Sequence, residues 1–513
     1  MSVHAPYGRE RIRKGAIQFL LGKVLSSIAG MAVLVLLVRH LTVSEFAAYS
    51  VLQAFVYVFT AVTGFGLLHV TLRYIPELYA QHKRHTLRGF VLWTIGLRLV
   101  LLTLATIAVY GAGRQIADVF GLAGWVQVFQ AYLIVVWLRV NSHFLFQILE
   151  STLHQGLGQA AFVATILLKL IFIYWLMAVN EMKLLNVVWA ELTAELIGML
   201  IFSIGVIMVQ RETRVENDSA DLSSWWSGNS RRVIRYGAAG YLQQLVILPY
   251  GSAPNRLVIG HFMGAASIAA FGFAQSFIDV INRYLPAQLL GGLIRPVVVA
   301  KFATRGNFSE VTRLLAFVFR INTVLLGLLL APLLAVGQQI VGFISNGKYG
   351  FEATLLLAAM IGVLMLDSRR YLLDMAIQAI EQYKVLIAGN LVLAASLLLA
   401  VGLMPWFAAM AIPMASAIGL LASNAWIAHR LKKVGFSFPV GFLDFFRVLG
   451  TTVVAAGLGY FFSTMLNWTI VIVIVFLLQF VLLWMTGAMR EEDWVLIRNI
   501  RRTPSLQANQ DAI

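Results

Sequence analysis

The stretch VVWAELTAELIGMLIFSIGVIMV, from Val187 to Val209, decides the class of fold. Its residues are almost all apolar, and a helix needs about 20 such residues to cross the hydrocarbon core of a bilayer. The apolar residues run continuously and do not alternate with polar ones, which favours a helix over a barrel strand. Two acids, Glu191 and Glu195, lie inside the run. Ionisable groups at that depth are costly and indicate a functional site.

Runs of this kind recur along the chain, and they predict an all-α, polytopic membrane protein with about 14 transmembrane helices. Of the 513 residues, 60% are hydrophobic and 12% are charged, roughly half the charged fraction of a soluble domain. The run that begins at Ile17 is too long for a signal peptide, so we interpret it as a retained first span. The predicted spans lie near 17–38, 46–70, 90–112, 124–148, 160–179, 186–209, 234–254, 262–287, 312–335, 354–376, 386–404, 409–429, 447–465 and 469–487.

Basic residues predict the orientation of these spans. If the N-terminus is cytoplasmic, the outside segments hold only Arg39, Arg114, Lys183, Arg256 and Lys348, and the other basic residues of the connections lie inside. Cytoplasmic loops are enriched in lysine and arginine, so we expect both termini on the cytoplasmic side of a bacterial inner membrane. The net charge of +16 is then an orientation signal beside anionic membrane lipid, and we expect no nucleic-acid partner.

The longest polar connection, Gln210–Arg235, separates two groups of six spans. It predicts an N-terminal six-helix lobe over 1–210, a cytoplasmic inter-lobe linker over 211–233, a C-terminal six-helix lobe over 234–430, and an extra helix pair with a cytoplasmic tail over 431–513. A weak echo between the halves, RHLTVSEFAAYSVLQ (Arg39–Gln53) and GHFMGAASIAAFGFAQ (Gly260–Gln275), fits a duplication. Transporters built from parallel repeats place the site between their lobes.

Several segments resemble a known family. They are LLVRHLTVSEFAAYSVLQ (Leu36–Gln53), GFGLLHVTLRYIPEL (Gly64–Leu78), PNRLVIGHFMG (Pro254–Gly264) and RPVVVAKFATRGNF (Arg295–Phe308). These are similar to the O-antigen and exopolysaccharide flippases of the multidrug/oligosaccharidyl-lipid/polysaccharide exporter superfamily, over roughly residues 15–430. Ala47 stands where a glycine is usual, and Asn255 where an aspartate is usual. No role of that aspartate therefore transfers to this chain.

The resemblance implies two six-helix lobes and a final helix pair around a cavity that opens to one side at a time. The cargo would be an undecaprenyl-pyrophosphate-linked oligosaccharide, moved from the cytoplasmic to the periplasmic leaflet for lipopolysaccharide or exopolysaccharide biosynthesis. An H⁺ or Na⁺ gradient would drive the movement, and polysaccharide polymerase machinery would be a partner. Two alternatives stay open: a drug or metabolite/cation antiporter of the same superfamily, and an integral membrane polysaccharide polymerase or ligase.

Basic residues within the spans are candidate ligands for such an anionic cargo. Arg139 and Lys169 fall near span centres with no acid at helical spacing, which favours either a cavity or a pair with another helix. Arg369 offers a bidentate fork for phosphate if it faces a cavity. Lys23 and Arg98 lie toward the cytoplasmic ends of their spans, where we expect them to extend to the interface.

Acidic residues within the spans are candidates for ion coupling. Glu191 and Glu195 are four residues apart, so they share a helix face and repel each other when both are ionised. Such a pair could carry a proton or hold a monovalent cation. Alternatively, it pairs with Arg139 or Lys169 on neighbouring helices. Asp279 is a third candidate for ion coupling.

Motifs of enzymes and metalloproteins are missing from the sequence. The chain has no cysteine, which excludes disulfides and thiolate chemistry, and His40, His69 and His261 are scattered and form no metal-ligand pattern. We find no Walker A motif, no HExxH and no catalytic-triad spacing. The sequence therefore predicts a transporter without a cofactor or a bound metal, and no enzymatic activity.

Overall fold

The computed structural model describes residues 9–80, 84–152, 154–212, 222–289, 308–380, 383–436, 438 and 442–488. These residues form helices and contain no strand, which confirms the all-α class. Twelve helical ranges among them are long and apolar enough to cross a membrane. They overlap all the predicted spans except the one near 234–254, and Lys384–Lys433 covers two of those spans.

The span predicted near 234–254 is absent from that set because its helix is interrupted and partly basic. The helix α9 (Leu222–Ile247) carries Arg231, Arg232 and Arg235 near its middle. It ends where Pro249 lies in a short 3-10 helix. Proline at this point removes a backbone donor and interrupts regular helical bonding.

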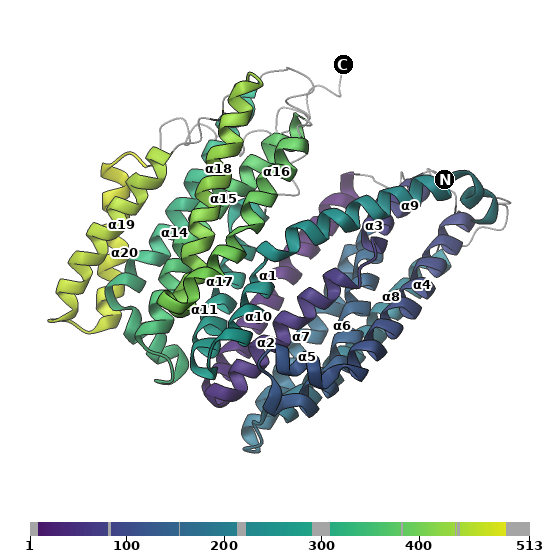
Figure 1. The fold of residues 1–513 in the computed structure, drawn as a ribbon, viewed down its shortest axis with the longest axis horizontal. Helices are drawn as coiled ribbons and strands as arrows, with labels where there is room; N and C mark the ends of the chain where they lie inside the picture. Colours follow the sequence, from purple (N-terminus) through teal and green to yellow (C-terminus); the bar gives the residue numbers. More distant parts are fainter. Residues whose placement is uncertain are drawn as a thin grey trace. The chain divides into compact units, whose positions relative to one another are not determined.

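The chain divides into two compact units, Met1–Phe273 and Ala274–Ile513. Figure 1 shows both as helical bundles, coloured along the sequence. The first unit contains α1 (Arg9–His40), α2 (Val43–Val62), α3 (Leu67–Ala80), α4 (Arg84–Gly111), α5 (Gly113–Val119), η1 (Ala123–Trp125), α6 (Val126–Ser151), α7 (Gln155–Ala178), α8 (Leu184–Glu212), α9, η2 (Leu248–Tyr250), α10 (Ser252–Phe262) and the start of α11 (Ala265–Tyr284). The second contains the rest of α11, α12 (Pro286–Leu289), α14 (Phe308–Ser345), α15 (Phe351–Ala379), α16 (Tyr383–Ala394), α17 (Ser396–Phe407), η3 (Ala408–Met410), α18 (Ala411–Lys433), α19 (Phe442–Ser463) and α20 (Trp468–Met485).

The structure describes only part of the predicted inter-lobe linker over 211–233. Residues 213–221 lie outside the described part of the chain, and the described remainder from Leu222 forms the first half of α9. This helix packs on α3 and α4, and α10 packs on α2, so both belong to the first unit. Aromatic side chains hold α9 there, because Trp225 stacks edge-on against Tyr74 and Phe90. The lobe limits inferred from the sequence remain a prediction.

The predicted span over 46–70 ends earlier than its apolar run. The chain turns after α2, with positive φ at Phe65 (46°) and Gly66 (73°), and then begins α3. A side chain on Gly66 would meet the backbone oxygen of Gly237 in α9 at 2.2 Å. Glycine is therefore required at this turn by both the dihedral angle and the close approach of α9.

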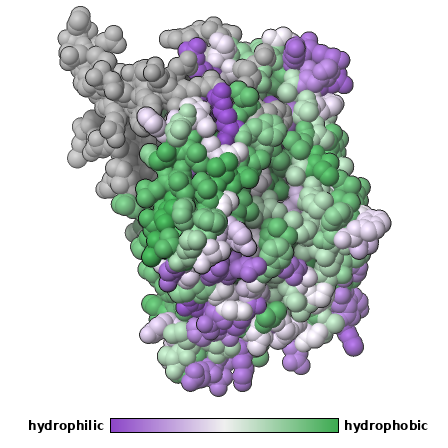
Figure 2. Space-filling view, turned by 90° about the vertical axis from the view of Figure 1, so that its left-hand side faces the viewer, coloured by the Kyte–Doolittle hydropathy of each residue, from purple (hydrophilic) through white to green (hydrophobic). Residues whose placement is uncertain are grey.

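The exposed side chains of the spans are themselves apolar. Leu104 is 59% exposed, Ile204 58% and Leu477 62%. Figure 2 shows one such surface, where a hydrophobic band lies above an edge rich in hydrophilic residues. Apolar exposure on this scale suits contact with lipid chains, because monomeric soluble proteins rarely expose large contiguous apolar patches.

Candidate functional site

Four of the sequence-predicted site residues lie together in the first unit. Arg139 belongs to α6, Lys169 to α7, and Glu191 and Glu195 to α8. The Nη2 atom of Arg139 lies 2.7 Å from Oε2 of Glu191, and its Nε lies 2.6 Å from Oε1 of Glu195. Lys169 forms a second ion pair with Glu191. The sequence left two alternatives for Arg139 and Lys169, a cavity or a pair with another helix. The structure contains pairs between neighbouring helices.

Three further polar side chains complete this group, which we call the charge cluster. Oxygens of Glu191 accept hydrogen bonds from the hydroxyls of Tyr49 (2.6 Å) and Tyr132 (3.0 Å). Gln53 donates to Glu191 at 3.4 Å and accepts from Nη1 of Arg139 at 3.0 Å. The charge cluster is defined by Tyr49, Gln53, Tyr132, Arg139, Lys169, Glu191 and Glu195.

Sequence reasoning missed these three residues as parts of a site. One signal was present, because Tyr49 and Gln53 are four residues apart on α2 and therefore share a helix face. Both lie in the segment that the second half of the chain echoes. Nothing in the sequence marks Tyr132, whose role depends on how α6 is turned toward α8.

The charge cluster has equal numbers of acidic and basic side chains and is largely buried. It contains two basic and two acidic side chains, and Glu191 is completely buried. The side chains of Lys169 and Glu195 are each 13% exposed, and that of Arg139 is 23% exposed. Buried charges are tolerated only when they are paired and hydrogen-bonded. Among the described residues, Glu195 forms an ion pair and hydrogen bond with Arg139 alone, whereas Glu191 has several such partners.

A capping residue sets the register of α2 against α8. Glu45 accepts a hydrogen bond from the backbone N–H of Thr42 at 3.0 Å, which completes a capping box at the start of α2. Its other oxygen accepts from the backbone N–H of Leu184, the first residue of α8, at 3.0 Å. Since one carboxylate joins both helix starts, Tyr49 and Gln53 are held opposite Glu191.

Arg98 forms a second polar site in the first unit, on α4. It is 4% exposed, although the sequence analysis expected it to extend to the interface. Its guanidinium donates to the backbone oxygen of Thr63 and lies 5.9 Å from the ring centroid of Phe144. No carboxylate among the described residues pairs with it, and its Nε has no hydrogen-bond partner there. A carbonyl and an aromatic face compensate the buried charge only in part.

A small cavity adjoins this arginine. Its volume is about 30 Å³, enough for one or two water-sized groups. Thr60 of α2, His143 of α6 and Gln244 of α9 supply polar atoms to its lining beside Arg98. A buried cation with such neighbours can bind an anionic oxygen. We call this cavity the Arg98 pocket.

The remaining predicted site residues lie elsewhere. Lys23 is half-buried on α1. Arg369 is 5% exposed on α15 of the second unit. Asp279, on the part of α11 that belongs to the second unit, accepts a hydrogen bond from Gln275 at 2.9 Å. Within the described ranges, no group of three or more His, Cys, Asp or Glu residues could hold a metal ion.

Solved structures with a similar fold are transporters. The lipid II flippase MurJ, in an inward closed conformation, gives a TM-score of 0.68 at 13% identity, over 92% of this chain and 99% of that chain. An inward-facing multidrug resistance MATE family transporter of the MOP superfamily gives 0.64 at 14% identity, over 82% and 99%. A MOP superfamily transporter from Pyrococcus furiosus gives 0.52 at 13% identity, over 83% and 96%.

Sequence comparison adds no closer relative. No family model matches the chain, and no curated protein matches it. The structural likeness therefore establishes a fold shared with the MOP superfamily. At such low sequence identity, the cargo must be argued from the chemistry of the sites.

Proposed function

We propose that this chain is a transporter that flips an undecaprenyl-pyrophosphate-linked oligosaccharide from the cytoplasmic to the periplasmic leaflet by alternating access. One observation carries the proposal: in a membrane-spanning bundle, Arg98 is a buried cation that has no carboxylate partner among the described residues and lies beside a small cavity with polar groups in its lining. A fold shared with a lipid II flippase supports a lipid-linked cargo. The solved structures of similar fold are transporters, and we propose transport without chemical change of the cargo.

The pyrophosphate is the part of this cargo that needs the protein most. A charged group that enters hydrocarbon unaided loses its hydration at a large cost in free energy. At the Arg98 pocket, the guanidinium would bind a phosphate oxygen, and the side-chain amide of Gln244 would donate a further hydrogen bond. The polyprenyl chain would remain in the bilayer beside the apolar helix faces.

The charge cluster is the proposed site of ion coupling. A proton or a sodium ion on Glu195 would change the cluster from balanced to positive and release Nε of Arg139 for an anionic oxygen. Binding of the cargo and of the ion would then depend on each other. A membrane potential that is negative inside also favours outward movement of an anion, by about 2.3 kcal/mol per charge per 100 mV.

The test is a flipping assay with purified protein in liposomes. A labelled undecaprenyl-pyrophosphate-linked oligosaccharide is added, and its exposure in each leaflet is followed with an impermeant quencher. We expect Arg98→Gln to lower the flipping rate at least tenfold and Arg98→Lys to retain part of it, since lysine keeps the charge but not the fork. The matched control is Arg114→Gln, an exposed arginine of α5, which should leave the rate unchanged.

Two results would reject this function. One is wild-type flipping by a folded Arg98→Gln protein, which would remove the buried cation from the mechanism. The other is the absence of flipping by the wild-type protein together with uptake of cationic drugs, which would favour the antiporter alternative.

A further inference from the structure

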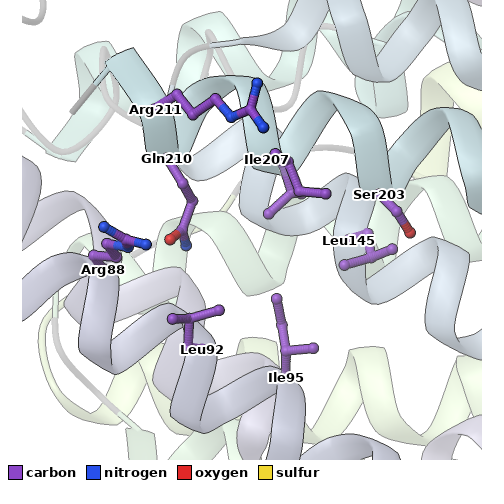
Figure 3. A pocket seen from close by; sticks show the side chains of 9 residues that line it. Arg88, Leu92, Ile95, Leu145, Ser203, Ile207, Gln210 and Arg211 are labelled. Carbon is purple, nitrogen blue, oxygen red and sulfur yellow. The ribbon is translucent and has the colours of Figure 1, made fainter. Parts of the chain in front are cut away.

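We infer that a groove between α4 and α8 of the first unit binds an anionic bilayer phospholipid as a resident ligand. Figure 3 shows this groove, whose volume is about 520 Å³. The inference concerns a ligand other than the transported cargo and does not depend on the proposed function.

The groove is polar at one end and apolar along its length. Arg88 of α4 and Gln210 and Arg211 of α8 gather at the polar end (Figure 3). Leu92 follows Arg88 by one helical turn, and Ile207 precedes Arg211 by one turn, so each helix leads from a charged to an apolar position. This order matches a phosphate headgroup followed by an acyl chain.

The exposure of the apolar residues shows that the groove is open at its rims and closed at its floor. Leu145 and Val206 form the floor and are 6% and 5% exposed. Leu92 and Ile207 form the rims and are 55% and 51% exposed. Both rims lie on membrane-spanning helices, so an acyl chain can enter sideways and cover apolar surface on the floor.

The two arginines at the polar end are available for an anion. Both are exposed, and among the described residues neither Arg88 nor Arg211 has an ion pair or hydrogen bond to a side-chain partner. Arginine binds phosphate through two parallel hydrogen bonds. Basic pockets between spans on the cytoplasmic side suit anionic headgroups, and the sequence analysis places both residues on that side. A free phosphate would leave the apolar floor unused, which is why we assign the groove to a phospholipid.

The groove is distinct from the Arg98 pocket. Arg88 and Arg98 are ten residues apart on α4, which corresponds to about 15 Å along the helix axis. No residue lines both cavities. Substitutions in one can therefore be made without touching the other.

The experiment measures lipid binding to the full-length detergent-solubilised protein by native mass spectrometry and thermal shift. Probes are phosphatidylglycerol, phosphatidylcholine with the same chains, glycerol phosphate, and undecaprenyl phosphate. We expect phosphatidylglycerol to bind and to raise the melting temperature, and Arg88→Gln with Arg211→Gln to weaken its binding at least tenfold. The matched control, Arg231→Gln with Arg235→Gln, removes the same charge from exposed positions of α9 and should bind as the wild type does.

A second variant keeps the test decisive if the double arginine variant does not fold. Ser203→Phe fills the groove at the end away from the arginines without a change of charge, and it should also weaken phosphatidylglycerol binding. Within the described part of the chain, Ser203 donates only to the backbone oxygen of Met199 in its own helix, so no hydrogen bond between helices is lost.

Four outcomes would overturn the inference. Equal binding of phosphatidylcholine would indicate general solvation by lipid, and binding of glycerol phosphate with equal affinity would indicate a free phosphate site. Preferential binding of undecaprenyl phosphate would assign the groove to the cargo. The acidic residues Glu212, Glu216, Asp218 and Asp221 follow Arg211 in the sequence, and phosphatidylglycerol binding only after their replacement by glutamine would assign the groove to them. Because Arg98→Gln leaves the groove intact, it should keep lipid binding whether or not it flips cargo.

Discussion

Glu191 is the residue on which the charge cluster depends. Its carboxylate accepts hydrogen bonds or ion pairs from Tyr49 and Gln53 of α2, Tyr132 and Arg139 of α6, and Lys169 of α7. Glu195, one turn further along α8, forms an ion pair and hydrogen bond only with Arg139 within the described residues. The two glutamates look alike in the sequence, but one joins three helices and the other lies at the edge of the network.

This difference predicts opposite behaviour of the two amide variants. Glu191→Gln leaves Lys169 and Arg139 with one carboxylate between them, and breaking a buried pair costs about 3–5 kcal/mol. We expect it to lower the melting temperature of the solubilised protein markedly. Glu195→Gln should keep most of the stability and instead weaken the dependence of transport on pH or Na⁺. Equal losses of stability in both variants would contradict the assignment of Glu195 as the exchangeable carboxylate.

At the scale of helices, the two segments that echo each other in the sequence, Arg39–Gln53 and Gly260–Gln275, are in contact. When Gln53 and Gln275 are aligned, Ser50 of α2 corresponds to Gly272 of α11. A Cβ atom on Gly272 would lie 2.1 Å from Oγ and 2.6 Å from Cβ of Ser50. The start of α11 therefore packs directly on α2 within the first unit, and only glycine fits at the crossing. The two echoed glutamines also both donate to a carboxylate, Glu191 in one case and Asp279 in the other.

The crossing predicts a compensating pair of substitutions. Gly272→Ala should lower the melting temperature because its methyl group overlaps Ser50, and overpacking of this kind typically costs about 1–3 kcal/mol. Adding Ser50→Gly removes both overlapping atoms and should restore part of the loss. Gly96→Ala is the control, since an added Cβ there meets nothing within 4 Å. A double variant no more stable than Gly272→Ala alone would show that the two positions do not interact.

At the scale of the whole molecule, the orientation of the chain in the membrane sets the direction of the proposed transport. Positions predicted to lie outside carry few basic residues, and those predicted to lie inside carry many. If both termini lie in the cytoplasm, as the basic residues predict, the groove at Arg88 and Arg211 faces the cytoplasmic leaflet, where anionic headgroups attract basic side chains. The direction proposed for the cargo and the ligand inferred for the groove both rest on this orientation.

The absence of cysteine allows this orientation to be measured directly. Single cysteines at Arg114 and Lys183 should react in intact cells with a maleimide that crosses the outer membrane but not the inner one. Cysteines at Arg231 and Lys432 should react only after the inner membrane is permeabilised. All four side chains are exposed, so accessibility reports the side of the membrane and not burial within the protein. A reversed pattern would invert the proposed direction of transport.

The sequence by itself determined the helical class, nearly all the spans and the ionisable residues within them. Helical spacing on the sequence also predicts that Arg370 pairs with Asp367 and Asp374, and the structure contains the pair with Asp374, whose Oδ1 lies 3.0 Å from Nε of Arg370. These features depend on short-range rules of hydropathy and helical periodicity. Only the tertiary structure decided that Arg139 and Lys169 share Glu191, that Arg98 is buried against Thr63, and that α9 packs on the first unit. These contacts depend on how each helix is rotated about its axis, and apolar residues all round a membrane helix leave that rotation unspecified.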